Sequence, residues 1–145
     1  MNIEDFMQIF QDAKLSGDKI ILKSGLHDAL KFLREQSTFC ILKDISAIDR
    51  SEKGIELIYH LYSQIDNEDV LISICVKDEA ESVIDLFKSA IADENEIYDM
   101  FGIHFSGNER LKRLYMPQDW EGFPLRKDYV EKDSRLAWND NEDNA

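Results

Sequence analysis

The sequence predicts one α+β domain in which helices pack on one face of a mostly antiparallel four-stranded sheet, followed by a long extended C-terminal segment. Three observations predict this fold. Apolar residues with helical spacing alternate along the chain with runs of period two, short polar turns separate the later runs, and regular periodicity ends near Gly102. The chain has 145 residues, 43% of them hydrophobic, which suffices for one buried core. We place the α+β core in residues 1–105 and a docking segment with its tail in residues 106–145.

The first third of the chain predicts a helix, a strand and a second helix. The i, i+3, i+4, i+7 spacing of an amphipathic helix is formed by Ile3, Phe6, Met7 and Phe10. Gly17-Asp18 is expected to end this helix, and residues 19–23 predict a short strand. Ser24 is the expected N-cap of the second helix. The apolar face of that helix is formed by Leu26, Ala29, Leu30 and Leu33.

Three strands and further helical segments follow. Strands are predicted over residues 39–48, 55–63 and 70–76, and the short turns between them favour antiparallel pairing. A third amphipathic helix is predicted by four apolar residues, Val83, Leu86, Phe87 and Ala90. The acidic residues 93–96 suit the start of another helix, which Gly102 would end at its C′ position.

Charge and composition narrow the classes of function. The net charge of −13 argues against nucleic acid or an anionic membrane surface as a direct partner. No apolar run approaches the roughly 20 residues that a membrane helix needs, and the acidic N-terminus is not that of a secretory signal. Cys40 and Cys75 lie in apolar runs, so we expect buried thiols of a cytoplasmic protein.

The stretch from Glu96 to Tyr129 differs from the rest of the chain. It holds both prolines, Pro117 and Pro124, and has little periodicity beyond Gly102. Residues 1–108 carry 10 basic and 21 acidic side chains, a net charge of −11, whereas residues 109–135 carry 7 and 6, a net charge of +1. Composition alone favours an exposed loop of mixed charge. The many aromatic and aliphatic side chains predict instead a segment that lies on a surface, part of it supplied by a partner.

The sequence lacks the constellations of known catalytic sites. It has no G-x-G-x-x-G, Walker or G-x-S-x-G motif. Its two cysteines and its histidines, His27, His60 and His104, are widely separated, so we predict no catalytic, cofactor-binding or metal-ligating residue. Glu94, Glu96 and Asp99 could form a carboxylate cluster for proton transfer, although an acidic first helical turn is the simpler explanation.

Two motifs resemble those of a known family. Residues 96–103, EIYDMFGI, and residues 119–129, DWEGFPLRKDY, resemble in order and distance the hallmarks of the 30 kDa-type (C) subunit of respiratory NADH:quinone oxidoreductase, complex I. The resemblance implies structural roles for five residues of the first motif, Glu96, Tyr98, Asp99, Phe101 and Gly102. The same family occurs in energy-converting membrane-bound hydrogenases. Asn95 stands where the family commonly has arginine, and the kind of complex stays open.

The resemblance implies a non-catalytic accessory subunit that binds no cofactor of its own. Such subunits lie in the peripheral arm on the cytoplasmic side of the membrane, against the large hydrogenase-like (49 kDa-type) subunit and near iron–sulfur subunits. Iron–sulfur clusters, and flavin or nickel–iron, are expected in those partners. The alternatives are the equivalent subunit of an energy-converting [NiFe] hydrogenase and, from another class, a stand-alone α+β enzyme that uses Glu94, Glu96 and Asp99.

We expect the second motif to form the partner interface. Arg126 is predicted to form an interchain salt bridge, for which Asp128 or a partner carboxylate would compete. The expected apolar anchors are Trp120, Pro124 and Tyr129. Asp119, Leu125 and Lys127 complete the predicted interface. The tail from Val130 is expected to extend along the partner through Leu136 and Trp138, or to fray.

Overall fold

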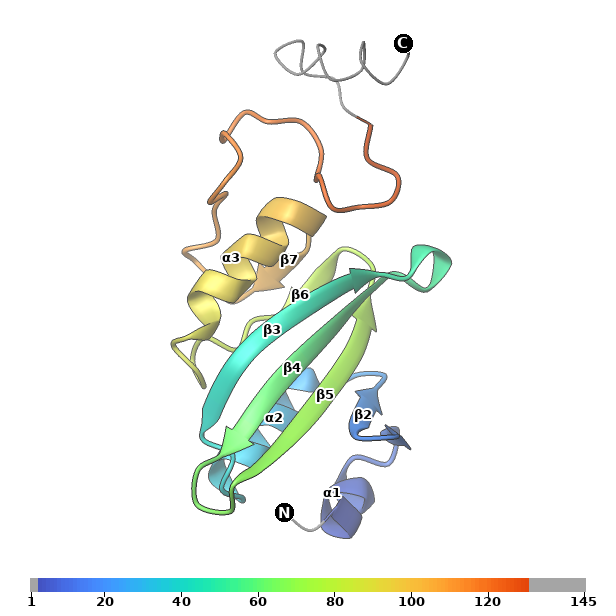
Figure 1. The fold of residues 1–145 in the computed structure, drawn as a ribbon, viewed down its shortest axis with the longest axis vertical. Coiled ribbons are helices and arrows are strands. Elements are labelled where there is room, and N and C mark those ends of the chain that lie inside the picture. The colour runs from blue at the N-terminus through green and yellow to red at the C-terminus, as the bar shows by residue number, and fades with distance from the viewer. Residues whose placement is uncertain (1–2, 131–145) are drawn as a thin grey trace.

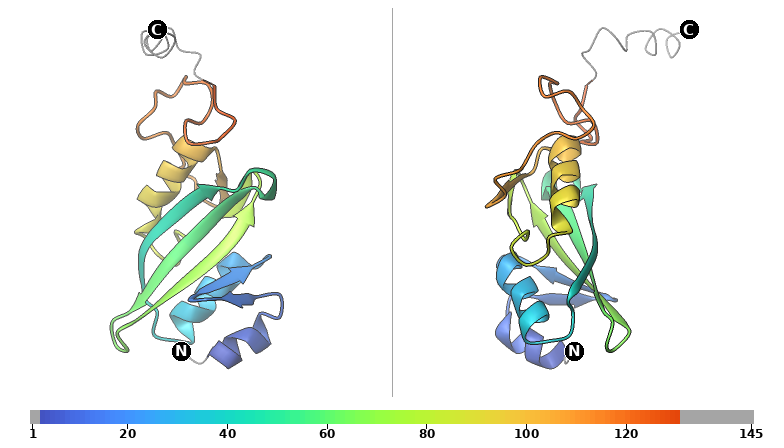
Figure 2. Two further views of the ribbon diagram at one scale, coloured as in Figure 1. Left: turned by 45° about the vertical axis from the view of Figure 1, so that its right-hand side comes forward. Right: turned by 90° about the vertical axis from the view of Figure 1, so that its left-hand side faces the viewer.

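The computed structural model describes residues 3–130 and has an α+β fold. Within these residues, the main sheet has five strands in the order β1-β2-β5-β4-β3. Their bounds are β1 (Lys14–Ser16), β2 (Lys19–Leu22), β3 (Ile41–Asp49), β4 (Ile55–Ser63) and β5 (Glu68–Val76). The helices are α1 (Ile3–Ile9), α2 (Leu26–Glu35) and α3 (Ala90–Phe101), with a 3-10 turn, η1 (Ser51–Lys53), between β3 and β4. Helices α2 and α3 lie on the same face of the sheet (Figures 1 and 2).

The prediction of four mostly antiparallel strands is wrong in two respects. Gly17-Asp18 does not end the first helix, but lies in the turn between β1 and β2, which pair as an antiparallel hairpin. Strand β1 has three residues, too few to show a period of two. Strand β2 pairs in parallel with β5. The reason is that α2 carries the chain back across the sheet, so that β3 runs in the direction of β2. The two following hairpins then give β5 the same direction.

The predicted third helix over residues 83–90 is also wrong. All four of its apolar residues are buried, but Val83, Leu86 and Phe87 lie in turns between β6 (Glu79–Glu81) and α3, which begins at Ala90. Buried residues in consecutive turns have the same three- and four-residue spacing as a helix face, so spacing could not separate the two structures. β6 pairs in parallel with β7 (His104–Ser106), and this small sheet joins the turns to the chain that leaves α3.

Two local predictions, the N-cap of α2 and the burial of the cysteines, are wrong. Gly25, with a φ of 73°, precedes α2 as its cap, and Ser24 makes no capping hydrogen bond. The Gly25 carbonyl accepts the hydrogen bond of Ala29 N–H instead. Cys40 and Cys75 are exposed, not buried. Cys75 follows the buried Ile74 in β5, and successive residues of a strand point to opposite faces.

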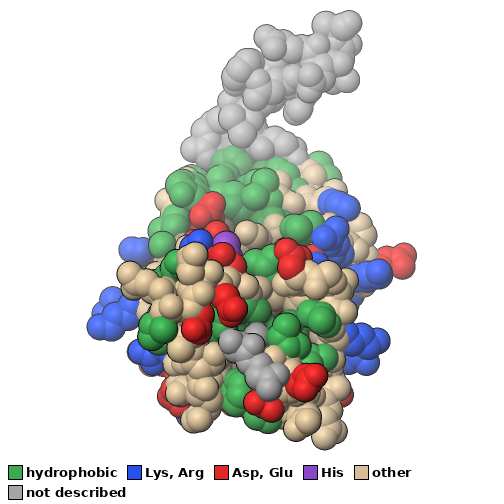
Figure 3. Space-filling model, turned by 60° about the horizontal axis from the view of Figure 1, so that its bottom comes forward, with side chains coloured by type: hydrophobic (Ala, Val, Ile, Leu, Met, Phe, Trp, Pro, Cys, Tyr) green, Lys and Arg blue, Asp and Glu red, His purple; other side chains and the backbone are tan. Residues whose placement is uncertain are grey.

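One buried carboxylate links three strands on the face of the sheet that α2 and α3 leave uncovered. Glu56 of β4 is 6% exposed and accepts hydrogen bonds from Lys19 Nζ and Ser73 Oγ, each at 2.9 Å. Arg50 Nη2 donates to the other carboxylate oxygen at 2.9 Å. Burial alone would raise the pKa of Glu56, but these donors outweigh it and lower the pKa from 4.5 to about 2. Seen from the bottom end of Figure 1, the surface shows acidic, basic and apolar side chains side by side (Figure 3).

Replacing Glu56 by glutamine should destabilise the protein most at neutral pH. A pKa lowered from 4.5 to about 2 corresponds to about 3 kcal/mol of stability, present above pH 4.5 and lost as the pH falls toward 2. Urea unfolding of both proteins between pH 7 and pH 2 would measure the difference, with the exposed Glu52→Gln as control. Equal losses of stability on acidification in wild type and Glu56→Gln would contradict this assignment.

Candidate functional site

The C-terminal segment, residues 107–130, contains no helix or strand and folds back over the end of α3 (Figure 1). The prediction of an extended segment is therefore wrong for these residues, because hydrogen bonds to buried groups hold the chain against the core. The predictions for Leu136 and Trp138 lie outside the residues that the structure describes. What holds the segment is a set of polar groups buried beneath it.

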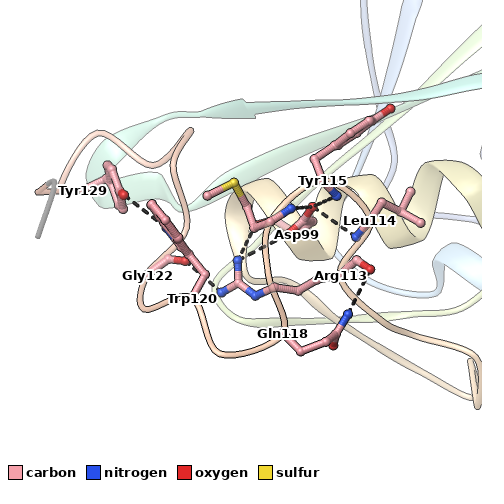
Figure 4. Close-up of polar contacts among 9 residues, drawn as sticks. Asp99, Arg113, Leu114, Tyr115, Gln118, Trp120, Gly122 and Tyr129 are labelled. Carbon is pink, nitrogen blue, oxygen red and sulfur yellow. Dashed lines mark hydrogen bonds and ion pairs between the residues drawn. The ribbon is translucent and has the colours of Figure 1, made fainter. Parts of the chain in front are cut away.

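The main anchor is the carboxylate of Asp99, in the last turns of α3. Asp99 is fully buried. Its Oδ2 accepts hydrogen bonds from the backbone N–H groups of Leu114 at 3.1 Å, Tyr115 at 2.7 Å and Met116 at 3.1 Å. Three consecutive backbone donors thus converge on one oxygen (Figure 4). Such convergence supplies hydrogen bonds that a segment without secondary structure would otherwise lack.

Arg113 completes this anchor. Its side chain is 6% exposed, and Nη1 lies 3.2 Å from Asp99 Oδ1. Nη2 donates to the carbonyl oxygen of Gly122 at 2.8 Å, and the guanidinium lies 4.8 Å from the centre of the Phe123 ring. A buried guanidinium with a carboxylate, a carbonyl and an aromatic face around it fixes the two ends of the loop between residues 113 and 123.

The end of α3 is built to receive Phe123. Gly102 ends the helix with a φ of 74°, as the sequence predicts for a C′ glycine. A Cβ atom at Gly102 would lie 2.5 Å from the Phe123 ring. The ring also lies 6.2 Å from that of Tyr98, which is half-buried. Glycine is therefore required at this position both by backbone conformation and by the close approach of Phe123.

Arg126 is bound within the chain. Its Nε donates to the Phe101 carbonyl, and Nη2 contacts the Lys77 carbonyl at 3.3 Å and Asp78 Oδ1 at 3.4 Å. The carboxylate that it meets is thus Asp78, not Asp128. Next to it, Lys127 N–H donates to Asp49 Oδ2 at 2.8 Å. Arg126 serves as a second anchor for the C-terminal segment, and the predicted interchain salt bridge stays a prediction.

A third anchor lies where the C-terminal segment begins. Glu94 is fully buried. Its carboxylate accepts hydrogen bonds from Ser82 Oγ at 2.7 Å, Val83 N–H at 2.9 Å and Asn108 Nδ2 at 3.0 Å. Burial raises the pKa of Glu94, and its neutral donors do not offset this. The neighbouring Asn95 accepts Lys112 N–H at 3.1 Å. Glu94 and Asp99 are therefore both used in structural contacts with different segments, while Glu96 is exposed.

The remaining predicted interface residues lie on the surface of the C-terminal segment. Asp119, Lys127 and Asp128 are exposed, and Leu125 is 56% exposed. Trp120, Pro124 and Tyr129 are half-buried, and Trp120 Nε1 donates to Tyr129 Oη at 3.2 Å. Two open grooves, of about 430 and 490 Å³, flank Arg126, and Asp78 and Asp128 line both of them. In the first motif, by contrast, Phe101 is buried and does not reach the surface of the segment.

Neither a metal centre nor a membrane helix is formed by the residues that the structure describes. Within residues 3–130, no three His, Cys, Asp or Glu side chains are grouped so as to hold a metal ion. In the same range, every helix is too short or too polar to cross a bilayer.

Sequence reasoning missed the buried roles of Arg113, Glu94 and Asn108. Arg113 follows Lys112 in a polar stretch, which is typical of a solvated surface. Its burial depends on Asp99, earlier in the chain, and on Phe123, later in the chain. The signal that pointed to a structural role for Asp99 was its position in the first family motif.

Asp99→Asn should destabilise the protein by on the order of 3 kcal/mol, because Arg113 would keep its buried charge without a carboxylate. The amide hydrogens of residues 114–116 should also exchange faster. Urea unfolding and hydrogen exchange measure both effects, and Glu96→Gln on the exposed side of the same helix is the matched control. Unchanged exchange at residues 114–116 would show that Asp99 does not hold them.

Glu94→Gln should change how stability depends on pH. Because the folded-state pKa of Glu94 is raised, its contribution is fully present below the unfolded pKa and is lost as the pH rises through the folded value. The stability of wild type relative to Glu94→Gln should therefore decrease from about pH 4.5 upward. Urea unfolding in a pH series measures this difference, and parallel profiles would contradict it.

Comparisons with known proteins assign this chain to a family. The family model of the respiratory-chain NADH dehydrogenase 30 Kd subunit matches residues 20–135. The C/D subunit of the NADH-quinone oxidoreductase of Phocaeicola vulgatus is 36% identical over 110 residues, covering 73% of this chain and 21% of the relative. The separate C subunit of the NADH-quinone oxidoreductase of Ruegeria pomeroyi is 35% identical over 115 residues, covering 75% of this chain and 58% of the relative.

The fold is also that of a chain in a solved structure, the membrane-bound sulfane sulfur reductase (MBS), an archaeal respiratory membrane complex. That chain superposes with a TM-score of 0.76 at 23% identity, over 99% of this chain and 89% of its own length. This likeness concerns the fold alone. The chain spans about a fifth of the length of the C/D relatives. The family model covers most of the chain and confirms the resemblance seen in its two motifs: the chain belongs to the respiratory-chain NADH dehydrogenase 30 Kd subunit family.

Proposed function

We propose that this chain is a non-catalytic accessory subunit in the peripheral arm of a complex I-like oxidoreductase, where it docks on the large hydrogenase-like (49 kDa-type) subunit. The observation that carries the proposal is the C-terminal segment. Its backbone is fixed to the core by Asp99, Arg113 and Arg126, while large apolar side chains on it remain in solvent. A segment without secondary structure that is fixed in this way suits a docking surface.

The names of the relatives support this partner. Several relatives are called C/D subunits, so that both designations belong to a single chain, of which this chain matches about a fifth. Two subunits joined in one polypeptide are held close together. If the D part is the hydrogenase-like subunit, as we propose, this favours direct contact between this chain and that subunit where the two are separate. The local charge also supports a docking role. Residues 109–135 have a net charge of +1 in a chain whose net charge is −13, which suits a segment that meets a partner of different charge.

We further propose that the chain supplies no cofactor ligand. Iron–sulfur clusters, and flavin or nickel–iron, would be held by partner subunits. The role of this chain would be to support their electron transfer, coupled to ion translocation, by holding the subunits in place. It would contact the membrane only through the complex, on the cytoplasmic side.

The equivalent subunit of an energy-converting [NiFe] hydrogenase is the alternative, and the composition of the complex separates the two. Purification through a tag on this chain, followed by mass spectrometry and metal analysis, would identify the modules that accompany it. A module that oxidises NADH with bound flavin supports the complex I-like assignment. Nickel in the hydrogenase-like subunit supports the alternative.

Ending the chain after Met116 should weaken co-purification with the hydrogenase-like subunit, because it removes the exposed Leu125 and Val130 with the rest of the C-terminal segment. The truncated protein keeps Asp99 and its three backbone donors, so we expect it still to melt cooperatively. A chain that ends after Val130 keeps the described segment and serves as the matched control, which we expect to co-purify. If the chain ending at Met116 assembles like wild type, residues 117–145 do not contribute to the docking surface.

A further inference from the structure

Residues 114 and 115 are held with their polar backbone inward and their side chains outward. The N–H groups of Leu114 and Tyr115 point to the buried carboxylate of Asp99. Their side chains are 43% and 68% exposed, and Figure 4 shows both directed away from Asp99. Two adjacent large side chains are thus kept in solvent by a backbone that cannot rotate to bury them without giving up its hydrogen bonds.

This arrangement is unfavourable for the isolated chain but favourable for binding. Exposed apolar surface costs about 25 cal/mol per Å², and a loop free to rearrange would tend to cover it. A fixed backbone, however, lowers the entropy that is lost when a partner covers these side chains. Tyrosine adds a large rigid ring and a hydroxyl that can donate a hydrogen bond at the edge of an apolar contact.

We infer that Leu114 and Tyr115 form the preorganised anchor pair of the docking surface, and that Asp99 is a positioning residue that acts through them. This inference rests on the proposed function. The surface that fits the pair is an apolar pocket on the hydrogenase-like subunit, with an acceptor for the Tyr115 hydroxyl at its rim. The exposed Arg110 and Lys112 shortly precede the pair in sequence, so carboxylates of the partner would complement their charges.

The pair differs from the residues of the second family motif. Arg126 has its guanidinium committed to Phe101, Lys77 and Asp78. Trp120 and Tyr129 bond to each other and are half-buried. The polar groups of these residues are thus used in contacts within the chain that hold the C-terminal segment in place. By contrast, Leu114 and Tyr115 present their large side chains to solvent while their backbone N–H groups bind Asp99.

The direct test uses the full chain and the purified hydrogenase-like subunit of the same complex. The double variant Leu114→Ser/Tyr115→Ser should bind about 10- to 100-fold more weakly, mainly through faster dissociation, with an unchanged melting temperature because both side chains are exposed. The control is Ile65→Ser, which alters an 81% exposed side chain in the turn between β4 and β5 and should bind like wild type.

A second measurement tests the positioning role. Asp99→Asn should speed dissociation of the otherwise native chain, at a temperature below its melting transition, but should have no further effect in the double-variant background. Additive effects would show that Asp99 does not act through Leu114 and Tyr115. If wild type does not bind the hydrogenase-like subunit, the proposed function is wrong. If wild type binds and the double variant binds equally well, the proposed function stands and the anchor assignment is overturned.

Discussion

The convergence of three backbone N–H groups and the Arg113 guanidinium on the Asp99 carboxylate is the interaction on which the C-terminal segment depends. A segment without helix or strand has no internal source of backbone hydrogen bonds, and burying them unpaired is costly. One carboxylate at the end of a helix satisfies three of these groups at once. Phe123 can then close over Gly102, and Arg126 can reach the Phe101 carbonyl.

The buried Glu56 and Glu94 illustrate how the chemistry of the donors decides the pKa of a carboxylate. Glu56 meets the cationic Lys19 and Arg50, and its pKa falls to about 2. Glu94 meets a hydroxyl, an amide and a backbone N–H, and its pKa is raised by burial. The first joins strands across the sheet, and the second joins the turns after β6 to the start of the C-terminal segment. In both, the carboxylate holds together parts of the chain that are distant in sequence.

Local patterns predicted those elements whose signals are contained within them. Alternation predicted β4 over residues 55–63, as found, and the glycine at 102 predicted the end of α3. The failures arise where a structure depends on distant partners. Strand β1 exists because β2 pairs with it, and β2 is parallel to β5 because of the path of α2. The turns over residues 83–89 imitate a helix because Val83 and Phe87 are both buried in the core without a helix between them.

The sequence by itself determined the α+β class, the family through its two motifs, and the unusual character of residues 96–129. These depend on composition, spacing and residue identity, all of which are local. Only the tertiary structure decided that the C-terminal segment folds back, that Arg126 is an internal anchor, and that Leu114 and Tyr115 face solvent. The physical reason is that a charged or apolar side chain has no fixed role until its neighbours are known. Arg113 is buried because Asp99 and Phe123 surround it, and no pattern along the chain brings those three residues together.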